Sequence, residues 1–210
     1  MNIFYADSLK KLKNFAKQKE QLGILERNVS NRANIFFRKL MQKQFGVIGR
    51  VRKKSLLEDI SDILKDEIPV EIQNHPFYKI WLIDMAKISS LFCDIQGTDT
   101  ICFWLGSKRG CRRYHTDSVP LRLLVTYAGK GTEWLPDEAA NRNAFSNGES
   151  NEKIVKNKSA LQFLKPWDIA VFRGGPDGLL HRTPDAALNN PSILMRLDNL
   201  SFLEALKIVQ

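Results

Sequence analysis

Apolar residues recur at helical spacing through the first ninety residues of the chain. In residues 7–21, Leu9, Leu12 and Phe15 lie among lysines, which predicts an amphipathic surface helix. The run 22–27 favours a strand, and Ser30 is the expected N-cap of a second helix over residues 31–45. Ser55 has capping-box spacing ahead of a third helix over residues 56–67, and a fourth is expected over residues 76–92.

From about residue 98 the pattern changes to short apolar or alternating runs separated by Gly, Pro, Asn and Asp. Such runs predict strands, over residues 99–105, 111–117, 121–127, 132–135, 160–164, 168–174, 179–183 and 192–198. Helices followed by strands indicate an α+β fold in which a β-sandwich or barrel packs against the N-terminal helices. The polar stretch between Pro136 and Ser159 predicts a mobile loop near one mouth of the barrel.

Charge is unevenly distributed along the 210 residues. Residues 1–54 hold 14 Lys and Arg against 3 Asp and Glu, whereas the rest of the chain holds 18 against 20. We expect a basic helical N-terminal segment over residues 1–54 and a single catalytic-type domain over residues 55–210, with helices over 55–92 and a barrel over about 98–200. A basic helix pair can contact nucleic-acid phosphate. Because no nucleic-acid motif accompanies it, a solvated helix face is the favoured interpretation.

The composition also bears on the compartment. The sequence contains no apolar run long enough to span a membrane and no secretory signal pattern at its start, so we expect a soluble cytoplasmic protein. Cys93, Cys102 and Cys111 are spaced by nine and form no Cys-x-x-Cys pair. This spacing fits neither a disulfide framework nor a zinc finger, and it indicates reduced, mostly buried thiols.

The tripeptide His115-Thr116-Asp117 is the first candidate for chemistry. On a strand, residues two apart point the same way, so both side chains could hold one metal ion. Alone the pattern is weak, since about one chain in six of this composition would contain it by chance. A site of the facial iron type needs a second histidine. His75 precedes a proline and is expected to open a helix, whereas His181 lies in a predicted strand and is the better third ligand. Cys111 is excluded, because about 13 Å separates it from His115 on a strand.

Several segments together resemble a known superfamily. The HTD motif, the string KPWDIAVFRGG, the string LLHRTPD and Arg196 within ILMRLD follow the order seen in the Fe(II)/2-oxoglutarate-dependent dioxygenases, over about residues 98–200. The resemblance implies a double-stranded β-helix, a jelly-roll or cupin-like barrel. It also implies Fe(II) on His115, Asp117 and His181, and 2-oxoglutarate with its far carboxylate on Arg196. A longer string, CRRYHTDSVPLRLLVTYAGKGTEWLP, resembles a bacterial family known only as a domain of unknown function.

This chain departs from the superfamily pattern near Arg196. The common Arg-x-Ser is Arg196-Leu197-Asp198 here, and the added carboxylate would disfavour an anion unless it is paired or turned away. Arg113 shares the predicted face of His115 and could be a second anion clamp, although Arg112, Arg113 and Arg122 could equally be rim residues. Tyr127 could donate a hydrogen bond to a co-substrate, or it could be a core tyrosine.

Three functions remain open from the sequence. The first is an oxygenase of the Fe(II)/2-oxoglutarate type that acts on an unknown small-molecule or macromolecular substrate. The second is a non-catalytic protein that handles or senses Zn(II) or Fe(II) on the same fold. The third is a nucleic-acid-associated protein that uses the basic segment over residues 1–54.

Overall fold

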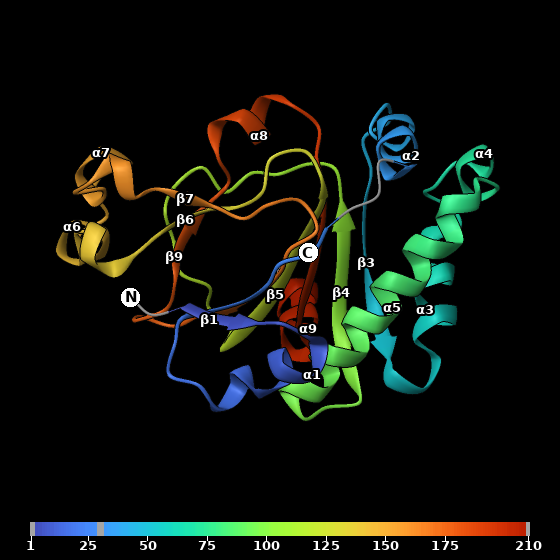
Figure 1. The fold of residues 1–210 in the computed structure, drawn as a ribbon, viewed down its shortest axis with the longest axis horizontal. Helices are drawn as coiled ribbons and strands as arrows, with labels where there is room; N and C mark the ends of the chain where they lie inside the picture. Colours follow the sequence, from blue (N-terminus) through green and yellow to red (C-terminus); the bar gives the residue numbers. More distant parts are fainter. Residues whose placement is uncertain (1–2, 29–31, 209–210) are drawn as a thin grey trace.

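Two β-sheets form the centre of the protein (Figure 1). The computed structural model describes residues 3–28 and 32–208. The seven strands of the main sheet, in spatial order, are β1 (Ile3–Ala6), β2 (Leu22–Leu25), β8 (Ile169–Arg173), β5 (Leu121–Ala128), β10 (Ile193–Asn199), β4 (Thr100–Gly106) and β3 (Gly46–Arg52). Strands β1 and β2 pair in parallel, and the other paired strands of this sheet are antiparallel.

A second, smaller sheet covers part of one face of the main sheet. Its antiparallel strands, in spatial order, are β7 (Gln162–Phe163), β6 (Glu133–Leu135) and β9 (Leu180–Arg182). Trp134 of β6 joins an apolar cluster with Leu124, Phe172 and Leu194 of the main sheet. The two sheets therefore face each other across a shared layer of side chains.

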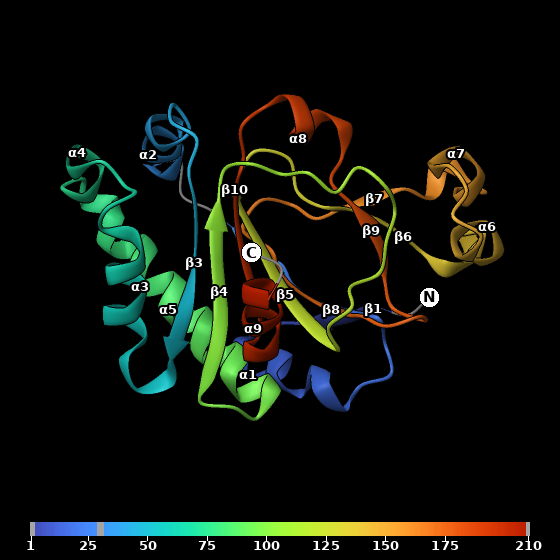
Figure 2. The same ribbon diagram turned by 180° about the vertical axis from the view of Figure 1, so that it is seen from behind.

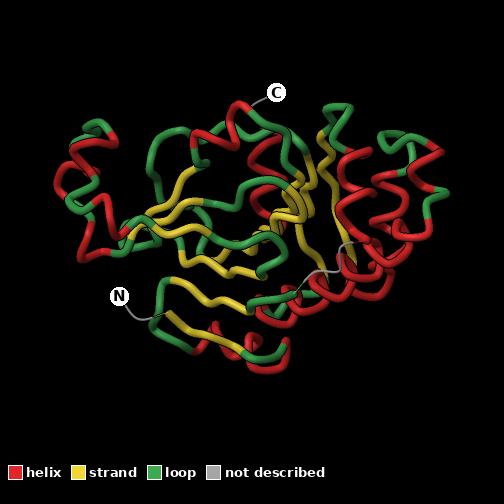
Figure 3. Tube along the Cα trace, turned by 45° about the horizontal axis from the view of Figure 1, so that its top comes forward, coloured by secondary structure: helices red, strands yellow, loops and turns green. Residues whose placement is uncertain are grey.

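A group of helices covers the opposite face of the main sheet. In chain order, the α-helices of the described residues are α1 (Leu9–Leu12), α2 (Arg32–Leu40), α3 (Leu56–Leu64), α4 (Val70–Gln73), α5 (Pro76–Gln96), α6 (Arg142–Ser146), α7 (Asn151–Ile154), α8 (Asp185–Asn189) and α9 (Leu200–Ile208). Of these, α2, α3 and α5 lie together against the main sheet (Figures 1 and 3). The longest, α5, begins with Pro76 in its first turn, where His75 Nδ1 accepts from the Phe77 N–H at 3.1 Å, and it ends at Gly97 in the left-handed region.

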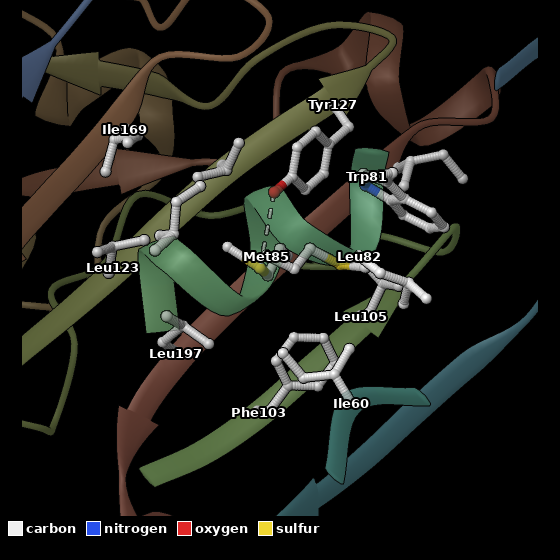
Figure 4. Packing of buried hydrophobic residues seen from close by; sticks show 14 of the residues in the cluster. Ile60, Trp81, Leu82, Met85, Phe103, Leu105, Leu123, Tyr127, Ile169 and Leu197 are labelled. Carbon is white, nitrogen blue, oxygen red and sulfur yellow. Dashed lines mark hydrogen bonds between the residues drawn. The ribbon is translucent and has the colours of Figure 1, made fainter. Parts of the chain in front are cut away.

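Alternation along β5 divides its side chains between the two faces. Leu123, Val125 and Tyr127 enter the large core beneath the helices, whereas Arg122 and Leu124 face the small sheet. Figure 4 shows Leu123 and Tyr127 packed in this core with residues of α5 and β4. Residues an odd number of positions apart on β5 therefore serve different layers of the molecule.

The C-terminal helix α9 lies on the face that carries the small sheet (Figure 2). Its Phe202 ring contacts the guanidinium groups of Arg122 and Arg196, at 5.2 and 4.7 Å from the ring centre. Helix α9 therefore closes one side of the space between the sheets.

Residues 136–159 differ from the loop that the sequence predicts. They contain α6 and α7, which pack on a small core of their own that includes Tyr114, Ile154 and Leu180. The backbone of Asn141 donates to the Ile154 carbonyl at 2.7 Å and fastens the two helices together. The polar composition hid these short helices because few apolar residues are needed to dock them.

Most of the predicted strands are confirmed. The exception is residues 111–117, which contribute only an isolated bridge at His115. Strands β1 and β3 were not predicted from the sequence. Ser55 does begin α3, but its hydroxyl donates to Asp59 Oδ2 at 3.1 Å, so it forms no capping box. Ser30, the predicted cap of α2, lies outside the described residues.

The predicted helical character of residues 1–54 is only partly right, because β1, β2 and β3 belong to the main sheet. The boundary at residue 54 stays a prediction about folding units, since strands from both sides of it share one sheet. Some of the basic charge is paired, as Lys53 contacts Asp94 at 2.8 Å, and nucleic-acid binding by this segment stays a prediction.

The α+β organisation is confirmed, with a large, mainly antiparallel sheet and helices packed against it. Within residues 3–28 and 32–208 the strands form no closed barrel. None of the helices described is long and apolar enough to cross a membrane.

Candidate metal centre

The structure brings His115, Asp117 and His181 together. His115 lies between β4 and β5, and its backbone exchanges two hydrogen bonds with His181 of β9, each 3.0 Å long. This pairing puts the two imidazole rings side by side, with their centres 4.4 Å apart. One ligand atom from each of the three residues lies within 4.8 Å of the others, so the group could hold a metal ion.

Backbone carbonyls orient both imidazole rings. His115 Nδ1 lies 3.0 Å from the Arg113 carbonyl, and His181 Nδ1 lies 3.0 Å from the Leu179 carbonyl. A carbonyl oxygen only accepts hydrogen bonds, so in the neutral rings the proton belongs on Nδ1 and Nε2 keeps a free lone pair. Burial lowers the pKa of His181 to about 3, which keeps this ring neutral near pH 7. Histidines that ligate metals use the same kind of support on the second ring nitrogen.

Asp117 supplies a buried oxygen without a partner. Its side chain is 1% exposed, and its Oδ1 accepts a hydrogen bond from Nη1 of Arg122. Oδ2 is buried and has no hydrogen-bond partner among the described residues. Burial raises the pKa of Asp117, and the charge of Arg122 opposes this shift. Asp117 Oδ1 also lies 3.7 Å from His181 Nε2, and two imidazoles with one carboxylate match the donor set of a divalent metal ion.

The other charges near Asp117 form an alternating chain. Arg122 Nε donates to Asp198 Oδ1 at 2.7 Å, and Asp198 Oδ2 lies 3.0 Å from Arg196 Nε. Asp198 is fully buried between two arginines, and their positive charges oppose the rise in its pKa that burial causes. From the sequence, an anion can bind beside Arg196 only if the Asp198 carboxylate is paired or turned away, and in the structure it is paired.

A pocket of about 140 Å³ opens beside these charges. The main sheet, β9 and the connections between strands all line this pocket. The lining residues are Arg122, Leu124, Leu194, Arg196 and Trp104 of the main sheet, His181 and Arg182 of β9, and Lys108, Arg109, Gly110, Cys111, His115, Thr132 and Thr183 of the connections. The guanidinium of Arg196 lies between two rings, 5.3 Å from the centre of Trp104 and 4.7 Å from that of Phe202. Its position is thus held by aromatic contacts as well as by Asp198.

Two of the predicted co-substrate residues lie away from this pocket. Tyr127 points into the core on the helix-covered face, where its hydroxyl donates to Asp84 Oδ2 at 2.8 Å (Figure 4). Arg113 donates to the Glu149 carbonyl at 3.0 Å and lies 5.9 Å from the Phe145 ring, so it holds α6 and α7 to the chain before His115. Neither residue lines the pocket, whereas Arg196 does.

Sequence reasoning undervalued Arg122 and did not find Arg109. The sequence is compatible with a rim position for Arg122, yet its side chain is 10% exposed and joins Asp117 to Asp198. Strand parity could have found it, because Arg122 is the one charged residue in the apolar run 121–128 and lies on the opposite face from Tyr127. Arg109 follows β4 in a loop, where no periodic pattern indicates which way a side chain points.

The comparisons with known proteins give one family and several weak structural similarities. A family model described as "Protein of unknown function (DUF1826)" matches residues 6–198. No curated protein matches. Among solved structures, an Fe(II)/(alpha)ketoglutarate-dependent dioxygenase, TqaL, is 10% identical, with a TM-score of 0.46 over 90% of this chain and 86% of its own.

Two further structures are similar at the same level. A putative oxygenase from Shewanella oneidensis is 10% identical, with a TM-score of 0.44 over 95% of this chain and 90% of its own. The dioxygenase for auxin oxidation 1 from Arabidopsis thaliana is 11% identical, with a TM-score of 0.44 over 94% of this chain and 93% of its own. TM-scores below 0.5 establish neither a shared fold nor a shared activity.

Proposed function

This chain belongs to the DUF1826 family, and we propose that it is an oxygenase that uses Fe(II) and 2-oxoglutarate to oxidise an organic substrate. The sequence resemblance over residues 98–200 suggests this chemistry. The two facing sheets, with ligands contributed by β9 and by the connection before β5, are consistent with a double-stranded β-helix.

One observation carries the proposal: His115, Asp117 and His181 each offer a ligand atom within 4.8 Å of the other two. Both Nε2 atoms keep lone pairs, and Asp117 Oδ1 lies 3.7 Å from His181 Nε2, while Oδ2 accepts no hydrogen bond from the described residues. Two imidazoles and one carboxylate form the ligand type of non-haem Fe(II) oxygenases, which leave coordination positions open. His115, Asp117 and His181 would hold the iron. When bound there, iron and 2-oxoglutarate supply the activation of oxygen and the reducing electrons.

The charged residues around the three ligand candidates would bind the co-substrate or hold the ligand candidates in place. Arg196 lines the pocket and would bind the far carboxylate of 2-oxoglutarate, because its ion pair uses Nε and leaves the terminal nitrogens for a ligand. Arg122 holds Asp117 in place through Nη1. Asp198 fixes both arginines and, being paired to both, adds no net negative charge to the pocket.

A second function is favoured by the contact between Arg122 and Asp117. An arginine that neutralises a ligand carboxylate lowers the affinity of the site for a cation. A protein that handles or senses Zn(II) or Fe(II) reversibly, without turnover, would benefit from such a contact. This function requires the same three ligands and no role for Arg196.

Both functions require a bound metal ion, and metal analysis of the purified 210-residue chain tests this requirement. We expect about one metal ion per chain, and loss of the metal in His115→Ala and in His181→Ala. His75→Ala is the matched control, because His75 caps α5 and lies outside the pocket. A folded protein that binds neither Fe(II) nor Zn(II) after reconstitution would refute both functions.

Consumption of 2-oxoglutarate then separates the two functions. The oxygenase predicts Fe(II)-dependent consumption that is lost in Arg196→Gln while iron is retained. Tight metal binding without any consumption would support the metal-handling protein instead. The cytoplasmic location stays a prediction.

A further inference from the structure

Arg109 differs from the other arginines that line the pocket. Arg122 and Arg196 pair with Asp117 and Asp198, and Arg182 pairs with Glu133 at 2.8 Å. Arg109 makes no ion pair with any of the residues that the structure describes. It is a cation in the wall of the pocket that no described carboxylate contacts.

Two neutral groups hold the Arg109 guanidinium in place. Nη1 donates to the Lys130 carbonyl at 2.7 Å, and Nη2 donates to the Thr132 hydroxyl at 2.8 Å. Nε is buried and has no hydrogen-bond partner in the part of the chain that is described. Each terminal nitrogen therefore keeps one N–H group that is not bonded within the described residues, in a geometry fixed before any ligand arrives.

The surroundings of Arg109 leave its charge uncompensated. Burial lowers the pKa of Arg109 to about 10. A partly buried guanidinium that lines the pocket and contacts no described carboxylate would stabilise an anionic ligand group there.

We propose that Arg109 binds an anionic oxygen group, a carboxylate or a phosphate, of the substrate. The substrate class is thus an organic acid or phosphate ester whose anionic end is held by Arg109 while another part faces His115 and His181. Assigning this anion to the substrate rests on the proposed function, in which Arg196 takes the co-substrate. The anion site itself rests on Arg109 alone.

Trifluoroacetate is the probe for this site, followed by fluorine NMR with the chelator-treated full chain. Trifluoroacetamide is the neutral control. We expect the anion to bind and the amide not to bind, with the anion's affinity lowered about tenfold or more in Arg109→Gln. Arg109→Lys keeps the charge but loses the planar pair of guanidinium donors, so its affinity for trifluoroacetate should lie between those of the wild type and Arg109→Gln. Acetate and inorganic phosphate compete for the probe, and the stronger competitor identifies the group as a carboxylate or a phosphate.

Two matched variants decide whether the effect is specific. Lys108→Gln removes the neighbouring exposed charge and should change the affinity little. Arg196→Gln should also retain the probe. The proposal would be overturned if trifluoroacetate bound no more tightly than trifluoroacetamide. It would also be overturned if Arg109→Gln and Lys108→Gln lost affinity for trifluoroacetate equally, or if only Arg196→Gln lost it. Circular dichroism and melting curves establish that each variant is folded.

A titration of 2-oxoglutarate into metal-loaded protein separates this inference from the proposed function. We expect Arg109→Gln to bind 2-oxoglutarate as the wild type does. If Arg109→Gln loses it while Arg196→Gln keeps it, the anion is the co-substrate and the assignment to the substrate is overturned. If the wild type binds no 2-oxoglutarate, the proposed function fails while the trifluoroacetate result still decides the anion site.

Discussion

Replacing Arg122 by methionine should strongly destabilise the protein in the absence of metal. Among the described residues, only Arg122 donates a hydrogen bond to the Asp117 carboxylate, and it also donates to Asp198. Methionine fills a similar volume but carries no charge, so Asp117 would stay buried beside two imidazoles without compensation. Asp198 would keep its contact with Arg196.

Removal of one partner from a buried ion pair costs about 3–5 kcal/mol of unfolding free energy. The side chains of both aspartates are 1% exposed and that of Arg122 is 10% exposed, so solvent screening reduces this figure little. For a chain of this size, that loss lowers the melting temperature by roughly 6–20 °C. A divalent metal ion should restore part of the loss, because it replaces the positive charge beside Asp117.

Melting followed by circular dichroism, with chelator and then with Zn(II), measures both effects. Lys65→Met is the control, because Lys65 and its partner Asp62 are each more than half exposed at 3.6 Å, and their contact contributes little to stability. If Arg122→Met melted with the wild type and with Lys65→Met, the charge chain would not stabilise the fold and the reasoning would be refuted.

Three other substitutions test different parts of the structure. Gly174→Ala should lower stability by about 1–3 kcal/mol and reduce metal content, because the added Cβ would collide with the Asp117 carbonyl. Cys111→Ser should abolish the single fast phase expected in thiol titration at about pH 8, since Cys111 is exposed while burial raises the pKa of the two other thiols to about 11. Tyr127→Phe should cost about 0.5–1.5 kcal/mol in denaturant unfolding through the lost bond to Asp84, and leave metal content unchanged.

Each of these has an outcome that contradicts it. Gly110→Ala is the control for the glycine variant, because its added Cβ would meet no atom within 4 Å; equal metal content in both variants would contradict the close approach at Gly174. Two or three fast thiols would show that Cys93 or Cys102 is accessible. Loss of metal in Tyr127→Phe would mean that the two faces of β5 are not separate.

The ligand candidates could be read from the sequence because their signals are local. His115 and Asp117 are two residues apart, and His181 follows a turn-rich string and precedes the expected arginine. The sequence predicts that an extended strand over residues 111–117 brings the His115 and Asp117 side chains together. In the structure an isolated backbone bridge between His115 and His181 brings the ligand candidates together instead.

The remaining site residues depend on long-range packing that the sequence does not show. Asp198 lies on β10 and its partner Arg122 lies on β5, and these two strands are adjacent only in the folded sheet. Strand β3 escaped prediction because Gly46 and Gly49 interrupt its alternation, and it lies at a sheet edge where one face is exposed. Gly49 lacks a side chain where Ile63 of α3 approaches, so tertiary contact explains this residue better than strand propensity does.

The place of β10 in the main sheet has a consequence for synthesis of the chain on the ribosome. It is the last of the described strands to emerge, yet it lies between β4 and β5 in the finished sheet. Until it arrives, both neighbours present open edges that could pair with other nascent chains. Because β10 also carries Arg196 and Asp198, pairing of β10 with β4 and β5 and contact of Arg122 with its second carboxylate occur in the same step.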